Sequence, residues 1–161
     1  MMEEIKTVGS IVGLLTGGLY FYDRFAKGRP SASLTISIES NRPSPRVRIG
    51  NSSSYDLAIN DVTVYPAIYL VAEQEGAEGN LRASFGEKAY FMLKPGESKE
   101  VRIVPKFQNG IPLEIVKARR VTFLVWWRRG NATWLPQLPV PVYTDTTTIR
   151  KFGLEKPDIP V

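Results

Sequence analysis

The residues best suited to chemistry in this chain are tryptophans and arginines that crowd together near its carboxyl end. Trp126, Trp127, Arg128, Arg129 and Trp134 fall within nine positions. Arginines beside stacking aromatic rings are how many proteins hold single-stranded nucleic acid. Tryptophan is more often a core residue, however, and Trp and Arg are also enriched in the hot spots of protein interfaces. We therefore expect a candidate binding surface here, with a protein as the preferred partner and nucleic acid as the alternative.

Catalysis has few candidates in this sequence. It contains neither cysteine nor histidine, which excludes thiolate nucleophiles, Ser-His-Asp catalysis and the usual zinc sites. The acidic residues, among them Asp56, Asp61 and Asp145, show no spacing that would hold two carboxylates around a substrate. No segment matches the calcium-binding loop or the phosphate-binding glycine loop. We expect a protein that is not an enzyme and that needs no cofactor and no metal.

The elements that would position such a surface begin with an apolar segment. Residues 7–22 carry no charged side chain, and as a helix they would extend about 24 Å, somewhat less than the ~30 Å hydrocarbon core of a bilayer. We predict that residues 1–29 form a membrane anchor helix and hinge. The alternative is a helix packed on the rest of the chain, but its apolar residues surround it instead of forming one stripe. Residues that suit the membrane interface lie at the end of the segment and just after it: Tyr20, Tyr22, Arg24 and Lys27.

Two further features of this segment concern its neighbours. Gly9, Gly13 and Gly17 are spaced four apart, which would place them on one helical stripe where a second helix can approach, so self-association in the membrane is expected. Lys6 precedes the apolar run, whereas three basic residues follow it within seven positions. The positive-inside rule then predicts a single-pass protein with its carboxyl-terminal domain in the cytoplasm. The chain's net charge of +5 suits a domain near an anionic leaflet.

After the anchor, the hydrophobic period changes from helical to alternating. Residues 34–38 and 46–49 alternate apolar and polar side chains, which predicts two half-buried strands, joined through 43–45. A strand over 57–65 follows, in which the alternation breaks step near 60–61 and indicates a bulge. The alternation marks a β domain over residues 30–146.

The clearest turn in the chain is Lys94-Pro95-Gly96-Glu97, because Pro-Gly presets a type II turn. It predicts a hairpin-like unit between 90–93 and 101–104. Residues 121–127 are the most apolar strand and should lie centrally, with Val121, Phe123, Val125 and Trp127 on one face. The remaining expectations are a strand or short helical turn over 111–118, an edge strand over 140–144 and a loosely ordered tail over 147–161.

The order of strands and turns resembles a known architecture, chiefly through Leu93, Pro95, Gly96 and Glu97 in the clearest turn. It is similar to the small immunoglobulin-like domains that bacterial and phage proteins carry behind a single membrane helix. The resemblance spans roughly residues 5–145 and implies a mainly β fold: an amino-terminal transmembrane helix followed by an antiparallel immunoglobulin-like β-sandwich. The Cys-Trp-Cys framework of antibody domains is absent, so the resemblance concerns architecture alone.

These observations together predict a membrane-anchored, non-catalytic module that binds membrane lipid through its first helix. Its β domain would recruit or assemble with another protein at the cytoplasmic face. Two alternatives stay open: a structural component of a larger protein or viral assembly, and a nucleic-acid-binding β domain that uses the Trp126–Trp134 segment.

Overall fold

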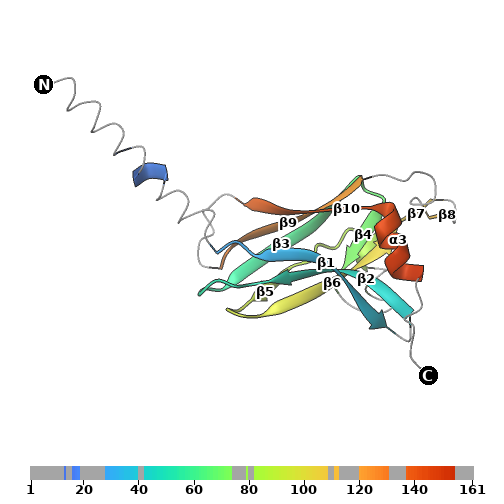
Figure 1. The fold of residues 1–161 in the computed structure, drawn as a ribbon, viewed down its shortest axis with the longest axis horizontal. Helices are drawn as coiled ribbons and strands as arrows, with labels where there is room; N and C mark the ends of the chain where they lie inside the picture. Colours follow the sequence, from blue (N-terminus) through green and yellow to red (C-terminus); the bar gives the residue numbers. More distant parts are fainter. Residues whose placement is uncertain are drawn as a thin grey trace, which may run out of the picture.

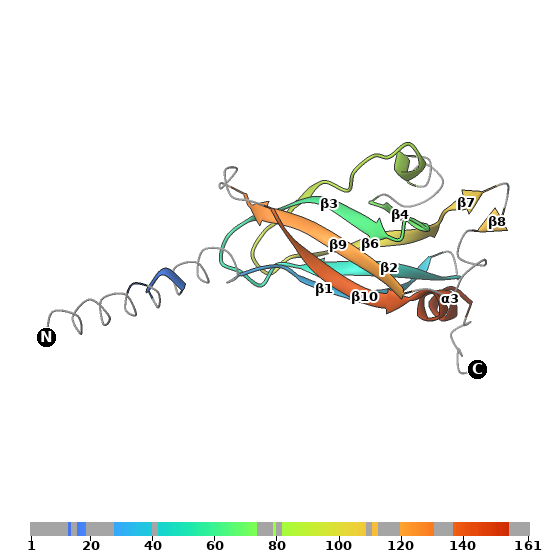
Figure 2. The ribbon, with the colours of Figure 1, turned by 90° about the horizontal axis from the view of Figure 1, so that it is seen from above.

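The computed structural model describes residues 13, 16–18, 28–39, 42–73, 79, 82–108, 111–112, 120–130 and 137–154. These residues form a mainly β fold in which two antiparallel sheets face each other (Figures 1 and 2). We call the end of this sandwich at which β1 begins the near end. The opposite end, where α3 lies in Figure 1, is the far end.

Each sheet has four strands. The first sheet has the order β1 (Ser31–Glu39), β2 (Arg42–Gly50), β6 (Ser98–Pro105) and β4 (Tyr69–Ala72). The second sheet has the order β10 (Leu138–Asp145), β9 (Arg120–Arg129), β3 (Leu57–Tyr65) and β5 (Phe91–Leu93). A separate ribbon of β7 (Phe107–Gln108) and β8 (Ile111–Pro112) projects at the far end, where the helix α3 (Thr146–Leu154) also lies (Figure 2).

The core lies between the two sheets and follows from the alternation in each strand. On β9, Val121, Phe123, Val125 and Trp127 are all buried, while the residues between them are only partly covered. Because β9 pairs with β10 on one side and β3 on the other, the predicted central position of this strand is confirmed. A fully buried side chain such as Phe123 contributes roughly 1.5–3 kcal/mol relative to an exposed one.

A β-bulge in β3 decides which of its residues face the core. Leu57 and Ile59 point inward, and after the register shift between Ile59 and Asp61 the inward residues are Val62 and, partly covered, Val64. One extra residue is needed because side chains alternate with a period of two, so odd and even positions cannot both face the core in an unbroken strand. The bulge expected near 60–61 is therefore confirmed.

The structure corrects two predicted connections. Residues 43–45 are not the link between the first two strands but belong to β2, where they pair with β1 alone. Proline is tolerated there because that part of β2 has a partner on one side only. The turn at Lys94 is confirmed by a hydrogen bond of 3.0 Å from Glu97 N to Lys94 O and by a positive φ of 79° at Gly96. The hairpin is wrong, because the turn joins β5 in the second sheet to β6 in the first.

The carboxyl-terminal region also differs from expectation. Residues 146–154 form α3 and are not a loosely ordered tail, since Thr146 and Ile149 are buried and Ile149 belongs to the core cluster. The missed signal was Asp145, a residue type that commonly caps a helix at its first turn. Of residues 111–118, the first two are a strand; the others lie outside the described residues. The edge strand near 140–144 is confirmed as β10.

Little of the predicted anchor falls within the described residues. Gly13 and residues 16–18 are helical and exposed, and nothing lies within 4 Å of where a Cβ would stand on Gly13 or Gly17. The structure leaves Gly9, Tyr20, Tyr22, Arg24 and Lys27 undescribed. In the part of the chain that it does describe, no helix has both the length and the apolar character needed to cross a membrane. The anchor therefore stays a prediction.

Candidate interaction surface

The outer face of the second sheet carries two strongly exposed tyrosines, Tyr65 and Tyr143. The antiparallel register fixes its composition, because residues opposite each other on neighbouring strands stand side by side on one face. Three outward positions of β9 are each flanked by one residue of β10 and one of β3. The resulting rows are Tyr143–Thr122–Tyr65, Pro141–Leu124–Thr63 and Pro139–Trp126–Asp61. We call these nine residues, together with Met92 on β5, the aromatic face.

Several large side chains on this face are open to water. Tyr65 is 75% exposed and Tyr143 is 77% exposed, although each contains a ring that would contribute to stability if it were buried. Met92 on β5 is 45% exposed, and the adjacent Tyr90 is exposed as well. Tyrosine, tryptophan and methionine are the residue types enriched in protein interfaces, so this composition indicates a contact surface.

The indole of Trp126 is held in place at the centre of this face. Its Nε1 donates a hydrogen bond of 2.9 Å to Thr63 Oγ1, and the side chain is half-buried. Thr63 faces outward only because of the bulge in β3, which shifts the outward positions to odd numbers after residue 60. The bulge thus both completes the core and supplies the partner that orients this ring.

The outer face of the first sheet has a different chemical character. Where β1, β2 and β6 lie side by side, the same register argument places mainly small polar and charged residues on this outer face. They are Ser31, Ser33, Thr35 and Ser37 on β1, Arg46 and Arg48 on β2, and Ser98, Glu100 and Arg102 on β6. A solvated face of this kind is the ordinary composition of an antiparallel sheet with one wet side, which makes the aromatic face the exceptional one.

The binding surface predicted from residues 126–134 does not lie on one face of the sheet, because side chains alternate along β9. Trp127 is only 6% exposed and lies in the core, so its assignment to a binding surface is corrected. Arg128 pairs with Ala58 on the outer side of the second sheet, beyond the row of Trp126. Arg129 turns the other way, and its guanidinium lies 4.2 Å from the centre of the Tyr55 ring. Trp134 lies among the residues that the structure does not describe.

Sequence reasoning missed the tyrosines that dominate the face. Tyr65 is the last residue of β3, and Tyr143 lies between Val142 and Thr144 on an edge strand. Both positions look like ordinary strand ends until the register with β9 brings them to the two sides of Thr122. The available signal was the phase of the alternation after the bulge, which places Tyr65 on the side opposite Val62 and Val64.

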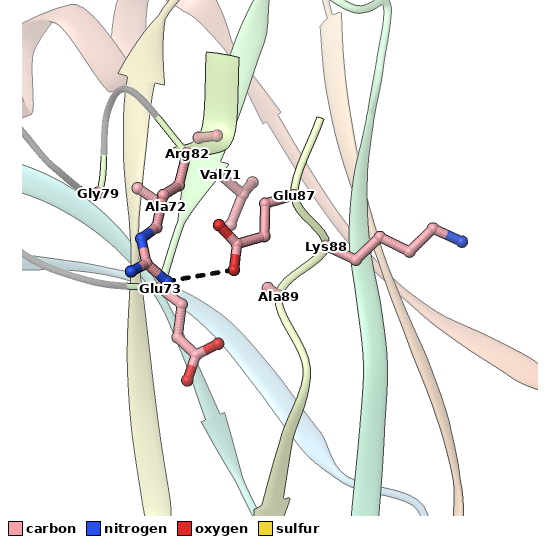
Figure 3. A pocket seen from close by; sticks show the side chains of 9 residues that line it. Val71, Ala72, Glu73, Gly79, Arg82, Glu87, Lys88 and Ala89 are labelled. Atoms are coloured by element: carbon pink, nitrogen blue, oxygen red, sulfur yellow. Dashed lines mark hydrogen bonds and ion pairs between the residues drawn. The ribbon is translucent and has the colours of Figure 1, made fainter. Parts of the chain in front are cut away.

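The described residues line pockets of different size. A pocket of about 30 Å³ lies between the end of β4 and residues 82–89 (Figure 3), well below the about 300–1,000 Å³ of usual ligand pockets. An open hollow of about 470 Å³ lies at the near end, where Ser31, Arg48 and Glu97 are among its lining residues. At the mouth of the smaller pocket Arg82 and Glu87 form an exposed ion pair of 3.4 Å, and Lys88 points away. Within the described ranges, no group of three or more potential metal-ligating acidic residues comes together.

The carboxylate of Asp145 is held by hydrogen bonds at the start of α3. Its Oδ1 accepts a hydrogen bond of 2.8 Å from Thr148 N, and its Oδ2 accepts one of 2.9 Å from Thr148 Oγ1. The backbone hydrogen bond from Thr148, followed by the side-chain bond, lowers the pKa of this carboxyl below its ordinary value. The carboxylate therefore caps α3 at its amino end.

Comparison of the chain with models of known protein families and with curated proteins finds no match.

Proposed function

We propose that this protein is a non-catalytic protein-binding module, held at a membrane by its amino-terminal segment, and that the aromatic face is its binding surface. The observation that carries the proposal is the contrast between the two outer faces. The first is polar where β1 and β2 pair with β6, and its partly covered apolar residues are Leu70 and Val104 at β4, whereas the second exposes Tyr65, Tyr143 and Met92. Exposed apolar side chains that are concentrated on one face mark a contact surface more often than scattered ones do.

The strand order supports an immunoglobulin-like architecture for the module. If β1, β2, β3, β4, β6, β9 and β10 are taken as strands A to G, the two sheets read A-B-E-D and G-F-C, which is the constant-type immunoglobulin order. The additional strand β5 departs from that order, because it follows β4 in sequence but pairs with β3 in the other sheet. It widens the second sheet, and Met92 extends the aromatic face over it.

The shape of the aromatic face favours a folded protein as the partner. Its rings come from the central strand and both neighbours of a continuous sheet, so they belong to one extended surface. Rigid Tyr and Trp side chains give contact area at a small cost in conformational entropy. A central indole that is already oriented by Thr63 lowers that cost further. With the anchor in a membrane, the module would recruit or assemble with this partner at the bilayer surface.

Site-specific photo-cross-linking in cells tests the proposal. A photoreactive amino acid is placed in the full-length protein at Tyr143, on the aromatic face, and in a matched protein at Ser33, on the outer face of the first sheet. We expect a discrete protein adduct from position 143 alone, which disappears when Tyr65→Ala and Trp126→Ala are added. Equal labelling from the two positions, or an adduct that is insensitive to both substitutions, would overturn the assignment of the binding surface.

The membrane part of the proposal has a separate test. Carbonate extraction of the same cells should leave the full-length chain in the membrane pellet, as expected for an inserted helix. Release of the chain into the supernatant would contradict the anchor without bearing on the aromatic face.

A further inference from the structure

The chain enters the sandwich through a tightly packed joint. Gly28 has a positive φ of 75°, and a Cβ added there would overlap the hydroxyl of Tyr55 and lie 3.0 Å from Ser53 Cβ. Pro30, two residues later, is fully buried. On its other side the Tyr55 ring is covered by the Arg129 guanidinium, 4.2 Å from the ring centre. The joint is therefore built into the near end of the sandwich.

Hydrogen bonds connect two turns of the near end into one platform. The backbone nitrogen of Asn51 donates to Glu97 O, and the nitrogen of Gly96 donates to Asn51 O, each at 2.8 Å. Residues 51–56, which include Tyr55, are thereby tied to the turn at 94–97. The chain therefore enters the sandwich beside this platform, because Gly28 packs against Tyr55 and Ser53.

The near end also carries an excess of positive charge. Its described basic residues are Arg29, Lys94, Arg128 and Arg129, and its described acidic residues are Asp56 and Glu97. Four basic against two acidic side chains leave a net charge of +2. Glu97 is partly engaged, since its Oε2 accepts a hydrogen bond of 2.8 Å from Lys94 N. The Lys94 and Arg29 side chains are exposed and available to an external anion.

From this arrangement we propose that the near end of the sandwich binds the headgroups of anionic phospholipids. The inference rests on the proposed membrane anchor, because the near end is the part of the sandwich that directly follows the anchor in the sequence and would lie nearest to the bilayer. Basic side chains within a Debye length of an anionic leaflet are attracted to it. The far end exposes at least as many basic residues, Lys106, Arg120, Arg150 and Lys151, so position relative to the anchor, and not charge, selects the near end.

Amide hydrogen exchange of the full-length chain in vesicles tests the proposal. The protein is reconstituted into phosphatidylcholine vesicles and into phosphatidylcholine vesicles with about 20% phosphatidylserine, which supply a neutral and an anionic surface. We expect exchange at residues 94–97 to be about tenfold slower on the anionic vesicles, and the difference to vanish at about 1 M salt. Exchange at the far end, between β3 and β4, should be equal on both.

Charge-reversal variants provide the matched comparison. Arg29→Glu with Lys94→Glu should abolish the slower exchange, whereas Lys106→Glu with Arg150→Glu should preserve it. If both pairs abolish it, attraction is set by net charge and the assignment of the near end is wrong. Equal exchange on the two kinds of vesicle, in a chain that carbonate leaves in the membrane, overturns this inference alone. A chain that carbonate extracts overturns the proposed anchor and this inference together.

Discussion

The side-chain amide of Asn51 donates a hydrogen bond of 2.9 Å to the carbonyl oxygen of Leu93, which joins the end of β2 in the first sheet to the end of β5 in the second. A second bond of 2.9 Å reaches Tyr55 O, and Asn51 Oδ1 accepts from Ser53 N and Ser53 Oγ. Asn51-Ser52-Ser53 matches a glycosylation acceptor pattern. With Asn51 only 2% exposed, its amide is engaged in closing the near end of the sandwich.

Replacing Asn51 should therefore destabilise the fold without touching the core. Asn51→Ala leaves the carbonyl oxygens of Leu93 and Tyr55 without this donor, and we expect a loss of about 2–3 kcal/mol in the free energy of unfolding, measured with urea. Asn51→Asp should lose at least as much, because a carboxylate would face the same two oxygens. The exposed neighbour Ser52→Ala is the control and should stay within about 0.5 kcal/mol of the wild type. An Asn51→Ala protein as stable as that control would contradict the argument.

The bulge in β3 predicts how the fold responds when Asn60 is deleted. Deleting Asn60 should give an unbroken alternation in β3 that keeps Leu57, Ile59, Val62 and Val64 on the core face, because the bulge adds one residue between the two inward pairs. We therefore expect the deletion variant to fold and to lose less than about 2 kcal/mol in the free energy of unfolding, as measured by circular dichroism and urea unfolding. Asn60→Ser keeps the extra residue and should cost less than about 1 kcal/mol, since Asn60 Nδ2 makes no hydrogen bond within the described structure. A deletion variant that does not fold would show that the bulge does more than set the phase of the two inward pairs.

The bulge and the central strand show what the sequence could predict. Both depend on local period: the break near Asn60 and the inward set of residues on β9 follow from alternation alone. Sheet membership does not follow from period, which is why the strands on either side of the turn at Lys94 looked like a hairpin. The pairing of β5 with β3 is a long-range contact, and no local pattern in residues 90–104 encodes it.

The candidate surface was predicted only in part for the same reason. Proximity in sequence grouped Trp126 with Trp127 and Arg128 with Arg129, but a strand sends neighbours to opposite faces. The true neighbours of Trp126 are Pro139 and Asp61, which are distant in sequence and become adjacent only through the register of three strands.

The two adjacent tryptophans should respond differently to truncation. Trp127→Ala removes a buried ring from the core and should cost about 3–5 kcal/mol. Trp126→Ala removes a half-buried ring and one hydrogen bond to Thr63, and should cost about 1–2 kcal/mol. Urea unfolding of the two variants provides the comparison, and Thr63→Val should account for the hydrogen-bond part of the smaller loss. Equal losses would mean that Trp126 is as deeply packed as Trp127 and is not available on the aromatic face.

The cap on α3 predicts a dependence on pH. Because Thr148 lowers the pKa of the Asp145 carboxyl in the folded protein, the charged form is favoured by folding. This contribution is complete above the unfolded pKa of about 3.9 and is lost as the pH falls through the lower folded pKa. Asp145→Ala should therefore lower the melting temperature at pH 5–7, and the difference from wild type should shrink below about pH 4.

A control and a contradicting outcome define this test. Asp145→Asn retains an oxygen that can accept from Thr148 N but cannot titrate, so its melting temperature should fall less steeply with decreasing pH than that of the wild type. Thermal unfolding followed by circular dichroism across a pH series measures all three proteins. Parallel curves for wild type, Asp145→Ala and Asp145→Asn would show that the charge of Asp145 does not contribute to the stability of α3. In that case the burial of Ile149 against the core would be what holds the helix.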